Sequence, residues 1–454
     1  MPNKSLAAII LAAGKGTRMK SERHKVLHPV GGKPMLDYLL DTVKSLGTNK
    51  TILVVGAEKE QLLAAYPDVD FVTQAEQLGT GHATKVAVEA LQKHGNPIPS
   101  DIILLYGDVP FIPPSLMQRM IKARQAPNTG LAVVGFYPAD PGAYGRMILD
   151  QDGSLQCIVE YKDASEDQQA VGLCNSGMMV IDGAYAADWL AMINNNNAAG
   201  EYYLTDLVAI VREAGQKAAF VEATEEDVMG INSREDLALA EAVLQRRWRS
   251  AALEAGVTMT DPSSVYFCAD TEIGSDVTIE PNVFFGPDVR IENGVTIKAF
   301  SHIEGAIIRT GAVIGPFARL RPGADIGKRA KIGNFVEVKK SLIAAGAKVN
   351  HLSYIGDAMI GENANIGAGT ITCNYDGFLK YQTVVGAGAF IGSNSALVAP
   401  VTIGDGAMVG AGSTVTQDVQ GDALALTRAK QRSVSGFAAK FRSDKAAEKA
   451  AKGK

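Results

Sequence analysis

The chain has 454 residues, a formal net charge of −5 and four cysteines. This length accommodates two or three domains with substantial cores. An acidic balance without a basic stripe interleaved with aromatic residues argues against nucleic-acid binding, and no apolar run reaches the length of a membrane span. The cysteines lack a metal-ligand spacing, so we expect free thiols in a cytoplasmic protein.

The first 230 residues alternate between apolar runs and amphipathic segments. This alternation favours a Rossmann-like α/β domain with a largely parallel sheet and helices on both faces. The run Leu6–Ala13 resembles a short signal core, but no cleavage region follows it, so a buried strand is expected. The expected strands are Leu6–Ala12, Thr51–Val55, Asp70–Thr73 and Ile102–Tyr106, and the expected helices are Met35–Leu46, Gly81–Gln92 and Pro114–Arg124.

A glycine-rich segment follows the first expected strand directly. Its glycines would let backbone amides approach phosphate oxygens, and Lys15 and Arg18 add positive charge. An ordinary glycine turn with solvated cations is the alternative, because Met19 stands where a dinucleotide fingerprint has a third glycine. The segment reads Leu11-Ala12-Ala13-Gly14-Lys15-Gly16-Thr17-Arg18-Met19.

Three later segments carry polar groups that suit a nucleotide. Gln74 and backbone groups near Gly79 could bind a base. Asp108, in the segment Tyr106-Gly107-Asp108, follows an expected strand at the end where open α/β sheets bind ligands. Asn232 adds a second oxygen ligand, and two such ligands with triphosphate oxygens and water suit Mg²⁺. For Asp108 alone, a turn-capping role is the alternative.

In the back half, a hydrophobic residue returns at almost every sixth position. The residue two places earlier is always small or β-branched. Neither a helix nor a long strand has this period, whereas short strands joined by tight turns, three to a coil, do. The sequence therefore predicts a parallel β-helix of hexapeptide repeats. The positions are Ile273, Ile279, Phe285, Ile291, Ile297, Ile303, Ile308, Ile314, Leu320, Ile326, Ile332, Val338, Ile343, Val349, Ile355, Ile360, Ile366, Val385, Ile391, Leu397, Ile403, Val409 and Val415.

Irregular steps in the repeat mark corners and an insertion. The five-residue steps that begin at positions 303, 338 and 355 indicate adjusted corners. The break between Ile366 and Val385 indicates an insertion, Thr370–Thr383, which includes Asn374 and Tyr375. Long polar loops on a rigid scaffold often carry function.

A helix is expected between the two halves. Ser233 can cap it, and it would run to Ala252 with apolar residues on one side. The expected divisions are 1–230 for the α/β domain, 231–252 for the linker helix, 253–436 for the β-helix, and 437–454 for a flexible tail rich in lysine and alanine.

Taken together, these motifs resemble the family of bacterial bifunctional N-acetylglucosamine-1-phosphate uridyltransferases and glucosamine-1-phosphate acetyltransferases. Several sugar nucleotidyltransferases share the front motifs, but Asn350–Tyr354, Asn365–Thr370 and the insertion are far more specific. The resemblance spans nearly the whole chain. It implies a left-handed β-helix and a homotrimer with sites between subunits. In one departure, His24 precedes Lys25 where the family usually has proline.

For the front domain, the resemblance implies transfer of UMP from UTP to N-acetylglucosamine 1-phosphate with release of pyrophosphate. The sugar phosphate itself attacks, so catalysis rests on positioning and on charge neutralisation by Mg²⁺, Arg18 and Lys25. Asp108 and Asn232 are the implied metal ligands. The implied nucleotide and sugar contacts are Leu11, Ala12, Ala13, Gly14, Lys25, Gln74, Gly79, Thr80, Tyr106, Gly107, Asp108, Gly145, Glu160, Asn175 and Asn232.

For the β-helix, the resemblance implies acetyl transfer from acetyl-CoA to glucosamine 1-phosphate, a step that precedes uridylylation and supplies precursor for peptidoglycan and lipopolysaccharide. The attacking amine must be neutral, so His351 is the candidate base. The backbone amide of Ala368 is the implied oxyanion donor. The remaining implied contacts are Arg321 and Lys339 at the sugar phosphate, Tyr354 and Asn365 around the sugar, and Asn374, Tyr375, Ser393, Ala411 and Arg428 on the acceptor or coenzyme side.

Two other functions remain open from the residues. One is a single nucleotidyltransferase, as in ADP-glucose synthesis, whose β-helix binds an allosteric effector; His351 and the Asn374-Tyr375 motif argue against it. The other is a non-enzymatic β-helical assembly module with a degenerate nucleotide-binding domain. Arg18, Lys25 and Asp108 argue against that degeneracy.

Overall fold

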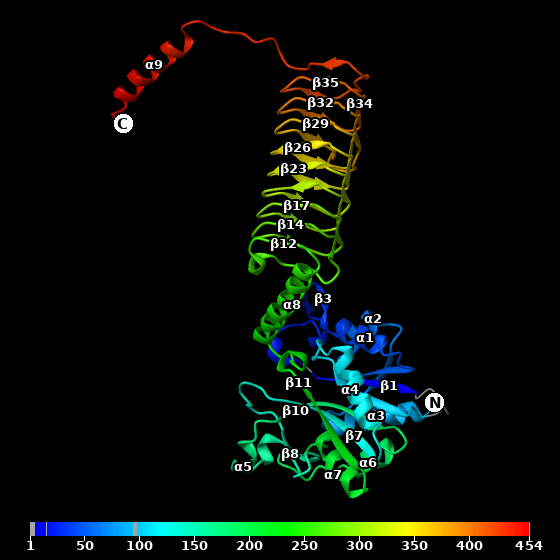
Figure 1. The fold of residues 1–454 in the computed structure, drawn as a ribbon. Helices are drawn as coiled ribbons and strands as arrows, with labels where there is room; N and C mark the ends of the chain where they lie inside the picture. The colour runs from blue at the N-terminus through cyan, green and yellow to red at the C-terminus, as the bar shows by residue number, and fades with distance from the viewer. Residues whose placement is uncertain (1–4, 15, 94–97, 454) are drawn as a thin grey trace. The chain divides into compact units, whose positions relative to one another are not determined.

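The computed structural model describes residues 5–14, 16–93 and 98–453. The chain divides into two compact units, Met1–Trp248 and Arg249–Lys454. The first is an α/β unit and the second is a stack of short strands (Figure 1). Across the described residues, no helix combines the length and the apolar character needed to cross a membrane.

The α/β unit is built on one twisted sheet. Its strands lie in the order β11-β7-β10-β6-β1-β4-β5. Neighbours within β6-β1-β4-β5 pair in parallel, as do β7 and β11, whereas β10 is antiparallel to both β6 and β7. The predicted, largely parallel sheet is thus confirmed, and within this order of seven strands β10 is the one that runs in reverse. The bounds are β1 (Leu6–Ala12), β4 (Lys50–Val55), β5 (Asp70–Thr73), β6 (Asp101–Tyr106), β7 (Thr129–Phe136), β10 (Cys174–Asp182) and β11 (Lys217–Ala223), with β8 (Arg146–Leu149) and β9 (Leu155–Val159) beside β10, and a separate β2 (Pro29–Val30) and β3 (Lys33–Pro34).

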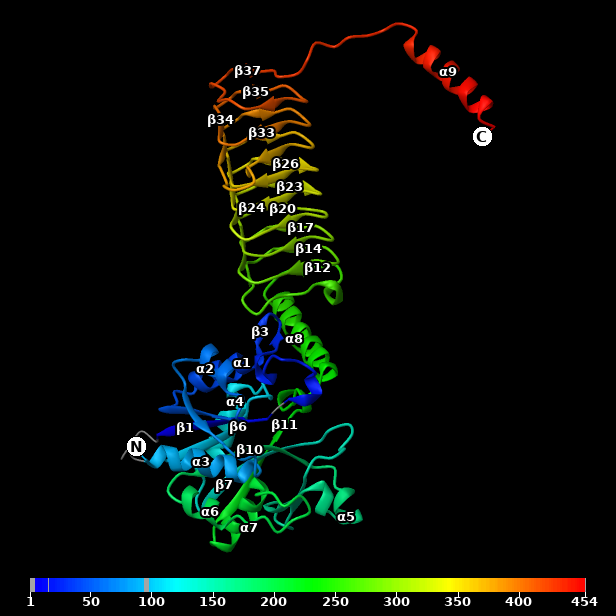
Figure 2. The same cartoon turned by 180° about the vertical axis from the view of Figure 1, so that it is seen from behind.

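Helices cover both faces of this sheet (Figures 1 and 2). Strand β1 is buried throughout, and its alternate residues enter two different cores, Ile10 with one face and Ile9 with the other. The apolar run Leu6–Ala12 is therefore a central strand. Helices α1 (Met35–Ser45), α4 (Pro114–Arg124) and part of α8 (Arg234–Glu254) contribute to the first core, and α3 (Thr80–Gln92), α6 (Ala186–Met192) and α7 (Leu207–Glu213) to the second.

Shorter helices complete the connections. They are α2 (Glu60–Ala65), α5 (Glu166–Gln169), and the 3₁₀ helices η1 (Thr17–Met19), η2 (Lys25–Leu27), η3 (Tyr161–Asp163), η4 (Leu204–Asp206), η5 (Glu225–Asp227) and η6 (Pro262–Ser264).

Helix α8 begins where the sequence predicts. The Asp236 backbone N–H donates to the Ser233 hydroxyl at 3.1 Å, and the Ser233 N–H donates back to the Asp236 carboxylate at 2.9 Å. This reciprocal pair satisfies two amides at the start of the helix. Ala240 and Leu244 are buried in the first core of the α/β unit, as their shared helical face predicts.

The second unit is a left-handed parallel β-helix. Each coil contributes one strand to each of three sheets, here called I, II and III, and coils stack along one axis (Figures 1 and 2). Sheet I holds β12 (Thr258–Met259), β14 (Thr278–Ile279), β17 (Thr296–Ile297), β20 (Val313–Ile314), β23 (Lys331–Asn334), β26 (Lys348–His351), β29 (Asn365–Ile366), β32 (Phe390–Ile391), β35 (Met408–Val409) and β37 (Leu424–Ala425). Sheet II holds β15 (Phe284–Phe285), β18 (His302–Ile303), β21 (Arg319–Leu320), β24 (Glu337–Lys339), β27 (Tyr354–Gly356), β30 (Ile371–Cys373), β33 (Ala396–Val398) and β36 (Thr414–Val415). Sheet III holds β13 (Glu272–Ile273), β16 (Val289–Ile291), β19 (Ala306–Ile308), β22 (Ala324–Ile326), β25 (Ser341–Ile343), β28 (Ala358–Ile360), β31 (Thr383–Val385) and β34 (Val401–Ile403).

The hexapeptide positions form the core of the β-helix. Apart from the half-buried Ile273 of the first coil, every predicted inward position is buried. The three five-residue steps are corners between sheets II and III, where Gly305, Lys340 and Asp357 take left-handed backbone angles. Both predictions are confirmed.

The predicted insertion begins later than expected. Its first residues, Ile371–Cys373, form the regular strand β30, which pairs with β27 and β33. Thr372 occupies the inward position and is 1% exposed, with its hydroxyl bonded to the Gly356 backbone. The repeat is therefore unbroken here. The apolar pattern did not reveal this strand because a hydrogen-bonded threonine occupies its inward position. The loop itself spans residues 374–382.

The chain ends in helix α9 (Phe437–Ala451), whose residues are all exposed. Flexibility of this segment stays a prediction.

Candidate active sites

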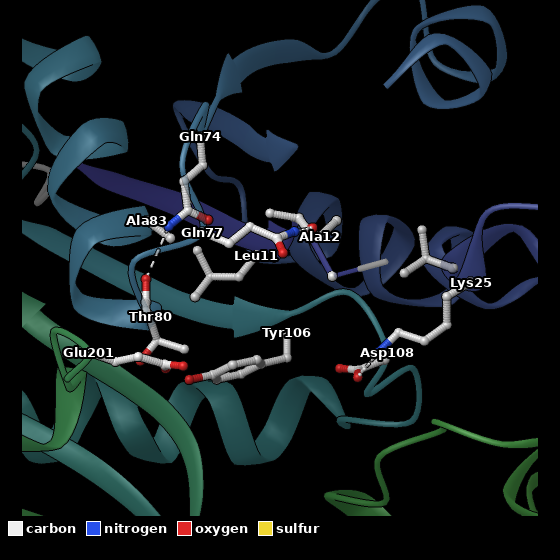
Figure 3. A pocket seen from close by; sticks show the side chains of 14 residues that line it. Leu11, Ala12, Lys25, Gln74, Gln77, Thr80, Ala83, Tyr106, Asp108 and Glu201 are labelled. Carbon is white, nitrogen blue, oxygen red and sulfur yellow. Dashed lines mark hydrogen bonds and ion pairs between the residues drawn. The ribbon is translucent and has the colours of Figure 1, made fainter. Parts of the chain in front are cut away.

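A pocket of about 330 Å³ opens at the carboxyl ends of β1 and β6. Figure 3 shows Lys25 and Asp108 at one side, and Gln74 and Thr80 at the other. The glycine-rich segment, the Gln74 segment and the Asp108 turn, all singled out from the sequence, converge here. The lining is Leu11, Ala12, Ala13, Gly14, Lys25, Val26, Gln74, Gln77, Gly79, Thr80, Ala83, Tyr106, Asp108 and Glu201.

A lysine ammonium lies between the two predicted metal ligands. Lys25 Nζ is 2.5 Å from Asp108 Oδ2 and 3.1 Å from Asn232 Oδ1. Two oxygens from segments far apart in sequence thus share one cation. Among the described residues, no group of three or more His, Cys, Asp and Glu side chains could hold a metal. The Asp108 and Asn232 oxygens suit an ion that takes two protein ligands and completes its shell with substrate and water, as Mg²⁺ does.

The backbone on either side holds Lys25 in place. Gly16 has φ +61°, and a Cβ there would lie 2.8 Å from the Lys25 Cβ, so the close approach requires glycine. His24 has φ −55°, a value that proline also adopts. Its N–H, which proline lacks, donates to Gln61 Oε1 at 2.9 Å. The departure at position 24 therefore leaves the backbone angle compatible with the family pattern.

The glutamine segment is tied to the pocket through side chains. Gln74 is 4% exposed, and its amide donates to the Gly79 carbonyl at 3.1 Å. Gln77, which the sequence motifs do not single out, donates to the Ala13 carbonyl. It thereby joins the segment to the glycine-rich loop. Glu201 was missed altogether, because it lies in a polar loop without a motif and reaches the pocket only through the fold.

The predicted sugar-side residues form a second cluster. The Asn175 N–H donates to the Gly145 carbonyl at 2.8 Å, and a Cβ at Gly145 would lie 3.4 Å from Glu160 Oε2. Thr205 donates to Glu160 Oε1 at 3.2 Å. Burial raises the pKa of the Glu160 carboxyl, and the Thr205 hydrogen bond opposes that shift.

Tyr106 links this cluster to the pocket. Its ring lines the pocket. The same ring packs so closely on Gly177, two residues after Asn175, that a Cβ at Gly177 would lie within 3.0 Å of it. Thr80, also predicted on the sugar side, hydrogen-bonds the Tyr106 hydroxyl. A Cβ at Gly107 would lie 3.2 Å from the Val26 side chain and 3.3 Å from the Ala12 side chain, so a larger residue would be crowded at this turn.

The glycine-rich segment also carries two predicted cations. Arg18 is exposed on η1 and does not line the pocket. Lys15 lies outside the described residues. The catalytic role of Arg18 stays a prediction.

In the β-helix, four predicted residues fall in one column. At the corner between sheets I and II, the backbone N–H of each coil donates to a carbonyl of the coil before it. The pairs are Leu352 to Asn334, Gly369 to His351, Asn394 to Ala368 and Gly412 to Ser393. His351, Ala368 and Ser393 therefore lie on consecutive coils, with Ala411 next to Gly412 continuing the line. The column has Asn334 at its foot.

Three cations lie close together where strands of sheet II end: Arg321 follows β21, Lys339 ends β24, and Lys380 of the loop lies near Lys339. Arg321 Nη1 lies 2.8 Å from Glu337 Oε1. A hydrogen bond and repulsion from Lys380, with repulsion from Arg321, lower the pKa of Lys339. Mutually repelling cations favour an anion among them, as the predicted sugar phosphate requires. Sequence reasoning missed Lys380 and Glu337: the first lies in the loop, and the second faces outward one coil before Tyr354.

The remaining predicted contacts lie on later coils, in the loop and after the last strand. Asn374 is buried and donates to Asp357 Oδ2 at 2.5 Å, which anchors the loop. Tyr375 is 60% exposed. Asn365 is half-buried on β29, and the Arg428 guanidinium donates to the Ala411 carbonyl at 2.5 Å. The role of each in binding stays a prediction.

Both units match known families. Residues 8–173 match the MobA-like NTP transferase domain. Residues 270–305 and 382–417 match the bacterial transferase hexapeptide repeats, and residues 302–388 match the GMPPB C-terminal domain.

Whole-chain relatives decide the family. The chain is 50% identical over 453 residues to the bifunctional protein GlmU of Paramagnetospirillum magneticum, with all of both chains covered. It is 52% identical to that of Sphingopyxis alaskensis over 98% of this chain and 99% of the relative, and 50% identical to that of Zymomonas mobilis over the same shares. The chain belongs to the bifunctional GlmU family. It is a bifunctional transferase that joins a nucleotidyltransferase domain to a hexapeptide acyltransferase domain. The family resemblance expected from the motifs is confirmed.

Proposed function

We propose that the chain makes UDP-N-acetylglucosamine in two steps. The β-helix acetylates glucosamine 1-phosphate with acetyl-CoA, and the α/β unit then transfers UMP from UTP to N-acetylglucosamine 1-phosphate with release of pyrophosphate. The observation that carries the proposal is the whole-chain identity to bifunctional relatives, combined with two separate clusters of the expected residues.

For the first step, His351 takes a proton from the attacking amine, and the Ala368 N–H stabilises the oxyanion. The column of His351, Ala368 and Ser393 supports a thioester that lies along the coils. Arg321 and Lys339, with Lys380 near them, receive the sugar phosphate.

For the second step, Asp108 and Asn232 would hold Mg²⁺, and the ion neutralises charge on the triphosphate when bound. Lys25 lines the same pocket and adds a positive charge beside those oxygens. Gln74 and the Gly79 backbone take the base, while Gly145, Glu160 and Asn175 take the sugar. The sugar phosphate attacks in line with pyrophosphate departure, so these groups act through positioning.

The working form is a homotrimer. Support comes from an apolar ridge on the corner between sheets I and II, formed by Phe300, Phe317, Phe335 and Leu352. Their exposed fractions are 52%, 45%, 56% and 61%, and all four have left-handed backbone angles. Large apolar side chains are rare in that conformation, and exposed patches of this kind mark interfaces.

We place the protein in the cytoplasm. The four cysteines, all within the described residues, are free thiols, which fits a reducing compartment.

A coupled assay tests the whole proposal. Purified protein is given glucosamine 1-phosphate, acetyl-CoA, UTP and Mg²⁺, and coenzyme A thiol, pyrophosphate and UDP-N-acetylglucosamine are measured. Omission of acetyl-CoA should abolish all products unless N-acetylglucosamine 1-phosphate is supplied. Pyrophosphate release from ATP with glucose 1-phosphate, without acetyl transfer, would instead support the single nucleotidyltransferase.

A further inference from the structure

His351 has a side-chain partner on the preceding coil. Its Nδ1 lies 2.8 Å from Asn334 Oδ1, and the two residues are paired in register between β26 and β23. An amide oxygen can only accept a hydrogen bond, so the proton of a neutral His351 ring belongs on Nδ1. The other ring nitrogen, Nε2, then carries the free lone pair that a base requires.

The fold fixes both ends of this contact. A Cβ at Gly333 would lie 1.9 Å from the Asn350 carbonyl oxygen, so the coils approach closely just before Asn334. The Asn334 carbonyl accepts the Leu352 N–H at 3.0 Å, directly after the histidine. The Ser353 hydroxyl donates to the His351 carbonyl at 2.8 Å. The histidine backbone is therefore held, and Asn334 fixes its ring.

We propose that Asn334 is a positioning residue for acetyl transfer, an inference that rests on the proposed role of His351 as base. As the amine nitrogen bonds to the thioester carbon, its proton passes to His351 Nε2, and the C–S bond then breaks. The proton ends on the departing thiolate of coenzyme A. During this cycle the ring becomes an imidazolium, and its Nδ1–H bond to Asn334 strengthens because the donor is charged.

A purely structural role predicts something different. If Asn334 only supports the stacking of coils, its removal lowers the melting temperature and leaves the pH dependence of acetyl transfer unchanged. If it positions the base, the folded protein loses turnover and the pH dependence responds to the acceptor at position 334.

The test compares Asn334→Ala and Asn334→Asp in the full chain, with Lys331→Ala as the matched control, because Lys331 is exposed on the same strand. Acetyl-transfer kcat and KM are measured across pH, with melting temperature and uridylyl transfer from supplied N-acetylglucosamine 1-phosphate on each preparation. Loss of a hydrogen bond to a group that becomes charged corresponds to about a 10- to 100-fold lower kcat for Asn334→Ala. The KM for glucosamine 1-phosphate should change little.

Asn334→Asp keeps the acceptor and adds a negative charge that favours the imidazolium. It should retain more turnover than the alanine variant and move the acidic limb of the acetyl-transfer profile to higher pH. Near-normal turnover in Asn334→Ala, or an unmoved limb in Asn334→Asp, overturns the positioning role while His351→Ala stays inactive. If His351→Ala itself keeps normal acetyl transfer, the proposed base is wrong, and the role of Asn334 fails with it.

Discussion

Lys25 and Asp108 form an ion pair of 2.5 Å across 83 residues of sequence, and Asn232 shares the same ammonium at 3.1 Å. The pair is largely shielded, with side-chain exposures of 12% and 17%. Two predicted metal ligands and one predicted catalytic cation are therefore a single cluster. A change at any one of them affects the charge balance of the pocket.

Asp108→Asn should separate the two activities. The substitution keeps the size of the side chain but removes the charge that attracts Mg²⁺. Uridylyl transfer should fall by roughly 10²-fold or more, since a bound metal contributes several kcal/mol of charge stabilisation. High Mg²⁺ should restore part of the rate. Acetyl transfer should stay near normal, and Asp70→Asn, an exposed pair with Lys50, is the control. Equal loss of both activities in a folded protein would contradict independent sites.

Glu160 gives a pH-dependent prediction. Burial raises its pKa in the folded protein above the ordinary value of 4.5. Stability relative to Glu160→Gln is therefore retained below the ordinary carboxyl range and lost as the pH rises through the raised value. As the pH rises over that interval, the melting temperature of the unmodified protein should fall relative to that of Glu160→Gln. Glu89→Gln, at an exposed position of α3, is the control. A constant difference in melting temperature for Glu160→Gln across this pH range would contradict the burial argument.

The β-helix core can be tested with two adjacent isoleucines. Ile308 is 0% exposed, whereas its neighbour Ile307 is 39% exposed on the same strand. Ile308→Ala should cost about 2–5 kcal/mol through lost burial and a cavity, and Ile307→Ala about 0.5 kcal/mol or less. Denaturant midpoints for the β-helix transition measure both. Similar midpoints for the two variants would contradict the inward assignment.

Periodicity predicted the fold well because it reports burial directly. The hexapeptide positions and the strand Leu6–Ala12 were correct for that reason. The start of the insertion was wrong, because Thr372 is buried through hydrogen bonds, which an apolar pattern cannot detect. The sequence analysis did not predict that β10 runs antiparallel to its neighbours, since strand direction depends on the connections between strands and not on local residues.

Sites were predictable only where a motif carried them. Asp108 and Asn232 stood out as oxygen ligands, but their meeting at Lys25 needed the fold. Glu201 and Lys380 occur in loops without a pattern. Asn334 precedes His351 by one coil, so a search one repeat before each candidate would have found it.

Phe317→Asn should weaken trimers without damaging the coil. Phe317 has φ +53°, and Asn282 and Asn394 occupy the same corner on other coils at +59° and +56°. Asparagine adopts this conformation more readily than phenylalanine, so the melting temperature of the isolated subunit should hold or rise. Light scattering should show a lower oligomeric mass at equal concentration. Ile307→Asn, at an exposed position on sheet III away from the corner between sheets I and II, is the control. Intact trimers in Phe317→Asn would remove the ridge from the interface.

The last prediction concerns His351. If this side chain takes the amine proton, His351→Ala should lower acetyl transfer by roughly 10²–10⁴-fold, the usual loss when general base help is removed. Uridylyl transfer from supplied N-acetylglucosamine 1-phosphate should survive, because its expected groups lie in the other compact unit. His302→Ala is the matched control, since His302 is also exposed on the β-helix but stacks on Phe284, off the column. A structural role for His351 predicts a lower melting temperature and loss of trimers instead. Because His351 is exposed and its side-chain contact is a single hydrogen bond to the half-buried Asn334, we expect neither. Near-normal acetyl transfer in His351→Ala, with His302→Ala equally active, would rule out His351 as the base.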